Sequence, residues 1–96
     1  MTPDDQRRAT AVADRLLSVV RDHCDAECLR QDYDAGEMGM VLERALVVAE
    51  QNDVLLPAGD VREAWECLII PGMVPPRTDL ARLRKIVDNR LADVTP

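Results

Sequence analysis

The segment 37–51 is apolar on almost every face of a helix, and this restricts the possible fold more than any other feature of the chain. Its main apolar positions follow helical spacing without interruption: Met38, Val41, Leu42, Ala45, Leu46 and Ala49. A helix that is apolar nearly all round is normally surrounded by other helices. We therefore predict that 37–51 is the central helix of a bundle. Its expected solvent-facing residues are Glu43, Arg44, Glu50 and Gln51.

Two helices are predicted before this segment. The first runs over 3–21, with Thr2 as N-cap, Pro3 at the first helical position and Asp5 completing a capping box. Its apolar stripe is Ala9, Val12, Ala13, Leu16 and Val20. A short second helix is expected over 26–34, and Gly36 ends it.

Two more helices are predicted after the central one. Asp60 is expected to cap the first, which buries Val61, Ala64, Trp65 and Leu68. Residues 71–77 are expected to form a stiff, proline-rich linker. Thr78 then caps a basic helix over 79–93, whose narrow apolar seam packs back on the chain or pairs with a partner. The seam positions are Leu80, Leu83, Val87, Leu91 and Val94.

The predicted fold class is all-α: a compact bundle of four to five short helices in a single domain spanning 1–96. No segment keeps the alternation typical of a strand, because 47–48 and 68–70, although strand-like in composition, lie within helical periodicity.

Charge is unevenly distributed along the chain, whose overall net charge is −6. Residues 22–66 hold twelve acids and three bases, a net charge of −9, while the flanks are mildly basic. An acidic middle is a poor surface for nucleic acid but steers a cationic protein well. We therefore expect a protein partner and no nucleic acid.

No membrane or export segment is recognisable in the sequence. A transmembrane helix needs about 18 consecutive apolar residues, and no such window exists. The acidic N-terminus has no apolar core of a secretory signal. We expect a cytoplasmic protein that does not bind membranes.

The sharpest candidate for a chemical site is the set His23, Cys24, Cys28 and Cys67, which has the composition of a structural zinc centre. No CxxC motif is present, however, and cysteine commonly packs in cores as a small apolar residue. The odd number of cysteines without a secretion signal favours reduced thiols. We expect packed thiols, and no metal or cofactor.

Catalytic motifs are also missing from the sequence. Carboxylate pairs such as Asp32 with Asp34, or Glu63 with Glu66, have the chemistry for acid–base work. In so acidic a chain such pairs arise by default as solvated faces. We expect that the protein is not an enzyme.

Acidic residues gather around the turn before the central helix. Asp32, Asp34 and Glu37 lie close to it, and Glu43 and Glu50 follow along one edge of the helix. Tyr33 and Met40 add an aromatic and a flexible apolar side chain, as in an interface core with a charged rim. The alternative is a solubilising face, since a carboxylate such as Glu37 is favoured at a helix N-terminus in any case.

The pattern Tyr33-x-x-Gly36-Glu37-x-Gly39-Met40-x-Leu42-Glu43, followed by Leu56-Pro57, resembles the Maf-type bacterial immunity proteins. The resemblance covers about residues 28–68. It implies a small, acidic, helical cytoplasmic protein that neutralises the C-terminal domain of a polymorphic or contact-dependent toxin made by the same cell. The only positions that the resemblance allows us to carry over from the family lie at the corner between the second and the central helix: Tyr33, Gly36, Glu37, Gly39 and Glu43. The proline-rich linker, the basic last helix and the cysteines depart from the family pattern.

The predicted function is therefore stoichiometric inhibition of a toxin domain, such as a nuclease, through the acidic surface. The predicted partner-binding residues are Asp32, Tyr33, Asp34, Glu37, Met40, Glu43 and Glu50. The alternative is a small helical adaptor or regulatory interaction module that homodimerises through its last helix. The identity of the toxin, the inhibited site, and the choice between monomer and homodimer stay open at the level of sequence.

Overall fold

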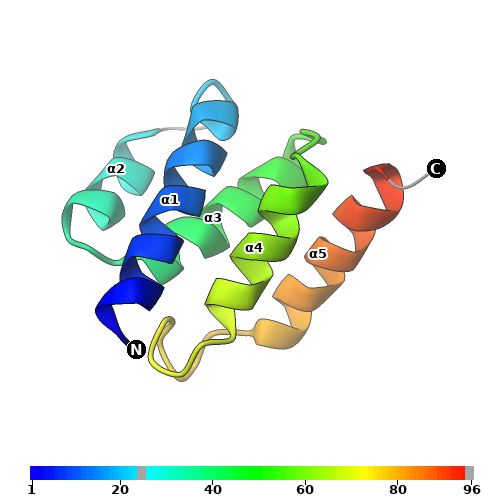
Figure 1. Ribbon diagram of the computed structural model, residues 1–96. Coiled ribbons are helices and arrows are strands. Elements are labelled where there is room, and N and C mark those ends of the chain that lie inside the picture. Colours follow the sequence, from blue (N-terminus) through cyan, green and yellow to red (C-terminus); the bar gives the residue numbers. More distant parts are fainter. Residues whose placement is uncertain (24–25, 95–96) are drawn as a thin grey trace.

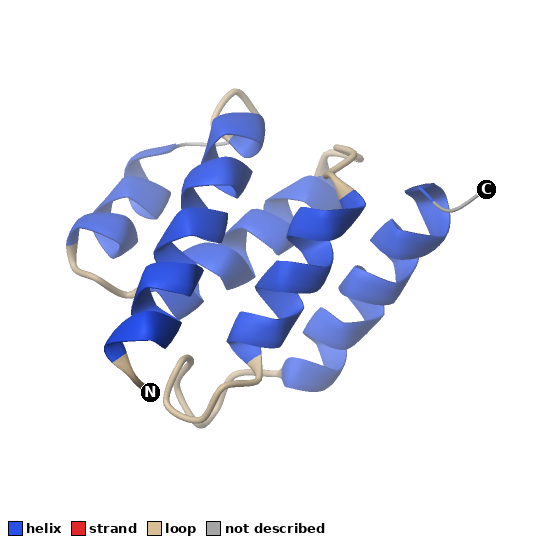
Figure 2. Ribbon diagram, viewed as in Figure 1, coloured by secondary structure: helices blue, strands red, loops and turns tan. Residues whose placement is uncertain are grey.

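The computed structural model describes residues 1–23 and 26–94, with side chains at 1–23 and 29–91. These residues form five helices and no strand (Figures 1 and 2). The helices are α1 (Pro3–Val20), α2 (Ala26–Asp34), α3 (Met38–Gln51), α4 (Ala58–Leu68) and α5 (Leu80–Val94). The predicted all-α bundle is confirmed.

Helix α3 is the centre of the bundle, as predicted. It packs against each of the other four helices. Its buried residues are Met38, Gly39, Val41, Leu42, Ala45, Leu46 and Ala49. Of the residues expected to face solvent, Arg44 and Gln51 are exposed, whereas Glu43 and Glu50 are half-buried.

The start of α1 follows the prediction closely. The Thr2 hydroxyl accepts a hydrogen bond from the Asp5 backbone N–H at 3.1 Å, and the Asp5 carboxylate accepts one from the Thr2 backbone N–H at 3.0 Å. This backbone hydrogen bond from Thr2 is the main reason that the pKa of Asp5 is lowered. The predicted α1 stripe is completely buried.

Two predicted helix caps are wrong. Helix α4 begins at Ala58 after Pro57 and has no side-chain cap. Asp60 therefore lies inside the first turn, where its carboxylate pairs with Arg15 of α1 (Oδ1 to Nε, 2.8 Å). At α5, the Asp79 carboxylate accepts the Arg82 backbone N–H at 3.0 Å, so Asp79 takes the role expected of Thr78.

The proline-rich segment 71–77 is not an extended spacer. It turns twice, with hydrogen bonds from the Met73 N–H to the Ile70 carbonyl and from the Thr78 N–H to the Pro75 carbonyl, each 3.0 Å. Met73 is buried, and the segment packs against the start of α3. The prolines therefore shape a tight crossing rather than hold two parts of the chain apart.

Helix α5 packs its apolar seam on its own chain. Leu83, Ile86 and Val87 belong to the buried core, and α5 contacts both α3 and α4. On the outer side, Trp65 of α4 is half-buried, and the Arg84 guanidinium lies 5.3 Å from its ring centroid. No helix among the described residues is both long and apolar enough to cross a membrane.

Candidate functional site

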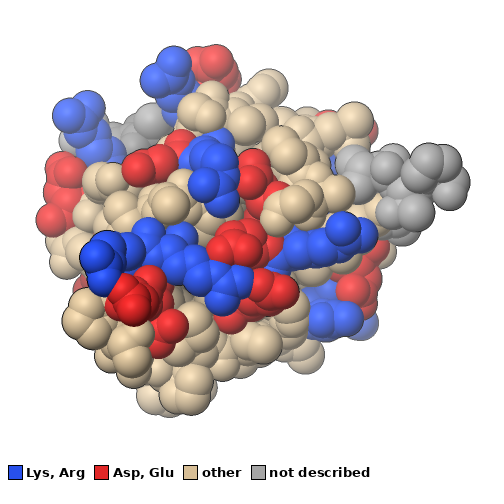
Figure 3. Space-filling view, viewed as in Figure 1, with Lys and Arg blue, Asp and Glu red and all other residues tan. Residues whose placement is uncertain are grey.

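Much of the acidic charge of the chain is paired within the fold. On the face formed by α1 and α4, arginines and carboxylates lie side by side (Figure 3). Arg8 of α1 pairs with both Glu63 and Glu66 of α4, and about two turns further along α1 Arg15 pairs with Asp60. Helix α4 therefore contributes little free negative charge for capturing a cationic partner.

This pairing also bears on acid–base chemistry. Glu63 and Glu66 both pair with Arg8, whereas a carboxylate pair suited to acid–base chemistry would share a proton. The Arg8 hydrogen bond holds the pKa of Glu63 below its ordinary value, and the two carboxylates raise the pKa of Arg8. The arrangement keeps Glu63 ionised, which suits a helix–helix clamp and not a proton donor.

Asp32, a predicted contact residue, also has a partner inside the fold. Its Oδ2 lies 3.0 Å from the Arg44 Nε, and its side chain is only 19% exposed. The pair links α2 to α3. Asp32 therefore stabilises the packing of α2 on α3, next to the α2–α3 corner, and is poorly placed to reach a partner protein.

Tyr33 lies away from Met40, contrary to the predicted grouping of the two. It lines a shallow hollow of about 410 Å³ between α1 and α2. There its hydroxyl donates to the Asp14 carboxylate, which is the main reason that the pKa of Tyr33 is raised. Asp34 lines the same hollow and is exposed.

The turn between α2 and α3 is built on two specific interactions. Gly36 adopts φ +78°, a left-handed conformation that glycine tolerates best. Its carbonyl accepts a hydrogen bond from the Gln6 side-chain amide of α1 at 3.0 Å. Glu37 follows as the N-cap residue of α3, exposed and without a capping hydrogen bond from its side chain. The carboxylate is therefore free to point outward.

Gly39 has a different role from Gly36. A Cβ at this position would lie 2.8 Å from the Met73 carbonyl carbon and 2.9 Å from the Val74 Cγ1. Only a residue without a side chain lets the α4–α5 connection pass this close to α3. Both glycines of the corner are thus explained by the fold, before any partner is considered.

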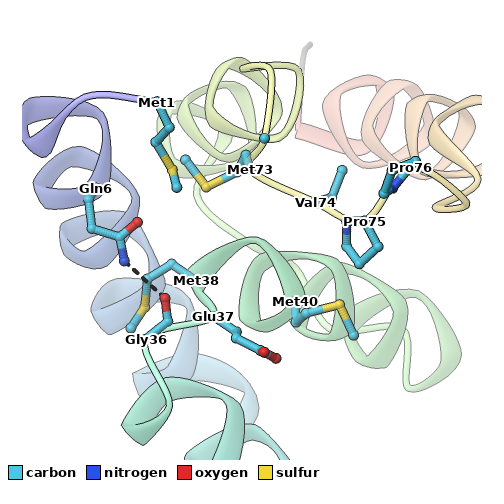
Figure 4. A pocket seen from close by; sticks show the side chains of 11 residues that line it. Met1, Gln6, Gly36, Glu37, Met38, Met40, Met73, Val74, Pro75 and Pro76 are labelled. Carbon is cyan, nitrogen blue, oxygen red and sulfur yellow. Dashed lines mark hydrogen bonds between the residues drawn. The ribbon is translucent and has the colours of Figure 1, made fainter.

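The crossing of these segments forms a groove of about 620 Å³ (Figure 4). All four methionines of the chain line it, and we call it the methionine groove. The remaining lining residues are Gln6, Gly36, Glu37, Gly72, Val74, Pro75 and Pro76. It joins the start of α1, the α2–α3 corner and the α4–α5 connection into one surface.

The structure therefore divides the predicted contact residues. Glu37 and Met40 line the methionine groove, while Asp34 and Tyr33 line the neighbouring hollow. Asp32 is paired, and Glu43 and Glu50 are half-buried further along α3. Glu50 is about 20 Å from Glu37 at 1.5 Å of helix rise per residue.

Sequence reasoning missed the groove residues Met1, Met38 and Met73. Met38 reads as an ordinary core position, and Met73 lies in a segment predicted to be a spacer. No local pattern brings them together, because the contact joins parts of the chain that are far apart in sequence. The one signal in the sequence that could have grouped these residues is that all of them are methionines.

The cysteines and histidine considered for zinc do not form a described site. Cys67 is completely buried among apolar residues, and burial raises the pKa of its thiol. His23 is exposed after the end of α1. The side chains of Cys24 and Cys28 lie outside the described residues. Among the side chains that are described, no three His, Cys, Asp or Glu residues gather as metal ligands would.

Comparison with protein-family models, with curated proteins and with solved structures finds no match to this chain. The functional argument therefore rests on the site itself.

Proposed function

We propose that this protein acts by binding another protein at the α2–α3 corner, as a stoichiometric inhibitor of a toxin domain in the cytoplasm. One observation carries the proposal: the exposed carboxylate of Glu37 lines an apolar groove, and that of Asp34 lines the neighbouring hollow, at a corner that the Gln6–Gly36 hydrogen bond ties to α1. An apolar centre with a charged rim is the usual composition of a protein interface.

The charge of this surface favours a cationic partner. In the described part of the chain, Asp34 and Glu37 have no ion pair, in contrast to Asp32, Asp60 and Glu63. Free carboxylates accelerate encounter with a basic surface and discriminate against acidic proteins. A toxin domain that acts on nucleic acid presents such a basic surface. Inhibition then follows from occupation of that surface, without turnover.

The alternative of an adaptor that homodimerises through its last helix gains no support from the packing of α5. Leu83 and Val87 of the expected seam are buried against α3 and α4. A dimer through that seam would have to expose the core of each protomer. Sedimentation at high protein concentration tests this alternative: a stable dimer favours it, and a monomer opposes it.

The decisive experiment starts with affinity capture of the tagged protein from the cells that make it. The captured protein's C-terminal domain is then expressed alone in a laboratory host. We expect growth arrest, which co-expression of this chain relieves. If the captured domain is harmless, or if the chain does not relieve its toxicity, inhibition of a toxin is contradicted.

Two charge-reversed variants then locate the contact. We expect Asp34→Lys with Glu37→Lys to weaken the complex by about 2–5 kcal/mol, because the two new lysines would repel the basic groups of the partner that the carboxylates attract. The control is Asp22→Lys with Asp88→Lys, which makes the same change of charge at exposed residues away from the corner. Calorimetric titration of the partner with each folded variant measures the affinities. If the two double substitutions weaken binding equally, a contact at the corner is contradicted.

A further inference from the structure

The methionine groove has the properties of a site for a partner's side chain. Its base is formed by Met38 and Met73, which are 5% and 7% exposed. Met40 is half-buried along one wall, and Met1, at 61% exposed, stands at the opening. Because methionine is unbranched and polarisable, such a surface adapts to apolar side chains of different shapes.

The frame around these flexible side chains is fixed. The Gln6–Gly36 hydrogen bond ties α1 to the corner, and the close passage of Met73 over Gly39 ties the α4–α5 connection to α3. Pro75 and Pro76 stiffen the far wall (Figure 4). A rigid frame with adaptable lining loses little conformational entropy when a side chain enters.

The charge at the groove selects among apolar ligands. Among the described residues that line the groove, Glu37 is the one with an ionisable side chain. The groove therefore presents an apolar surface next to one uncompensated negative charge.

We propose that the methionine groove receives an apolar side chain of the partner protein, flanked in the partner by a lysine or arginine that pairs with Glu37. This inference rests on the proposed function and specifies the chemistry of the bound segment. It places the apolar anchor of the interface at Met40 and the groove, and leaves Tyr33 outside it.

The test uses protein with ¹³C-labelled methionine methyl groups, which gives each groove methionine its own NMR signal. The probes are three short synthetic peptides, each carrying two test residues one helical turn apart. The first peptide carries leucine and lysine, the second leucine and glutamate, and the third serine and lysine. We expect only the leucine–lysine peptide to shift the Met38, Met40 and Met73 signals in a saturable way. Equal shifts with the leucine–glutamate peptide, or none with any peptide, would overturn the proposal.

Variants at the groove separate the apolar and the charged contributions. We expect Met40→Gln and Glu37→Lys each to weaken binding of the leucine–lysine peptide by about tenfold, which corresponds to one desolvated contact. Met40→Leu keeps the apolar surface and should bind normally, as should the distant control Asp22→Lys. If Met40→Gln binds as well as Met40→Leu, the groove is not the apolar site.

The same labelled protein distinguishes failure of this inference from failure of the proposed function. On addition of the captured toxin domain, the groove signals should shift. If the domain binds and is inhibited, yet the Met38, Met40 and Met73 signals stay unchanged, the groove inference is wrong and the proposed function stands. If no toxin is captured, the proposed function fails first.

Discussion

The Met73 carbonyl group lies directly over the Cα of Gly39, and this contact joins the two segments that form the methionine groove. We expect Gly39→Ala to lower the free energy of unfolding by about 1–3 kcal/mol, because the new methyl group collides with backbone atoms that cannot turn aside. Urea unfolding followed by circular dichroism measures the change.

Gly59 provides the matched control for this substitution. It lies in the first turn of α4, and a Cβ there would meet no atom within 4 Å. We expect Gly59→Ala to raise the free energy of unfolding by about 0.4–1 kcal/mol, since alanine restricts the unfolded chain. Equal effects of the two substitutions would show that Gly39 is not constrained by Met73.

Arg8 is expected to contribute more to stability than its neighbour Arg7. Arg8 joins α1 to two carboxylates of α4. Among the side chains that the structure describes, Arg7 pairs only with Asp4 in its own helix, where both side chains are largely exposed. We expect Arg8→Ala to lower the urea midpoint and Arg7→Ala to leave it almost unchanged. The reverse order would contradict the clamp between α1 and α4.

The clamp also makes stability depend on pH. The pKa of Glu63 is lowered in the folded protein from its ordinary value of 4.5, so the folded state holds its proton less tightly than the unfolded state. Its stabilising effect is complete above about pH 4.5 and is lost as the pH falls through the lower folded pKa.

Glu63→Gln tests this dependence directly. We expect the variant to be less stable than the parent at pH 7 and to lose less stability between pH 5 and pH 3, a range set by the lowered pKa. Parallel stability curves for the two proteins over this range would exclude Glu63 as a source of the acid sensitivity.

Asp32 should affect folding and not partner binding. Its carboxylate, 19% exposed, is engaged with Arg44. We expect Asp32→Ala to lower the free energy of unfolding by about 1 kcal/mol, at the upper end for such pairs. Affinity for the captured partner, corrected for the folded fraction, should not change. A specific loss of affinity would return Asp32 to the contact surface.

The predictions from local pattern and those that needed contacts between distant residues had different outcomes. The Thr2–Asp5 capping box and the α1 stripe are confirmed, because both depend only on residues within one or two helical turns. The predicted caps at Asp60 and Thr78 are wrong. Helix α4 begins two residues before Asp60, and the Asp60 carboxylate pairs with Arg15 of another helix, a contact that the local sequence does not contain.

For the acidic surface, too, local sequence predicted part of the outcome and long-range contacts decided the rest. Sequence alone located the negative charge between residues 22 and 66, but the arginines that neutralise part of it lie mainly in α1. Glu37 and Met40 were found from their place at the corner and do line one groove. Tyr33 was grouped with them by proximity in sequence, yet the turn of α2 directs it toward Asp14.

The sequence by itself determined the helices and the central position of α3, because helical periodicity and apolar content act over short distances along the chain. Only the tertiary structure decided which carboxylates are paired and where the methionines meet. The pairing depends mainly on the packing of α1 against α4. The meeting of the methionines depends on how the connection after α4 folds back over Gly39, a long-range contact made possible by a missing side chain.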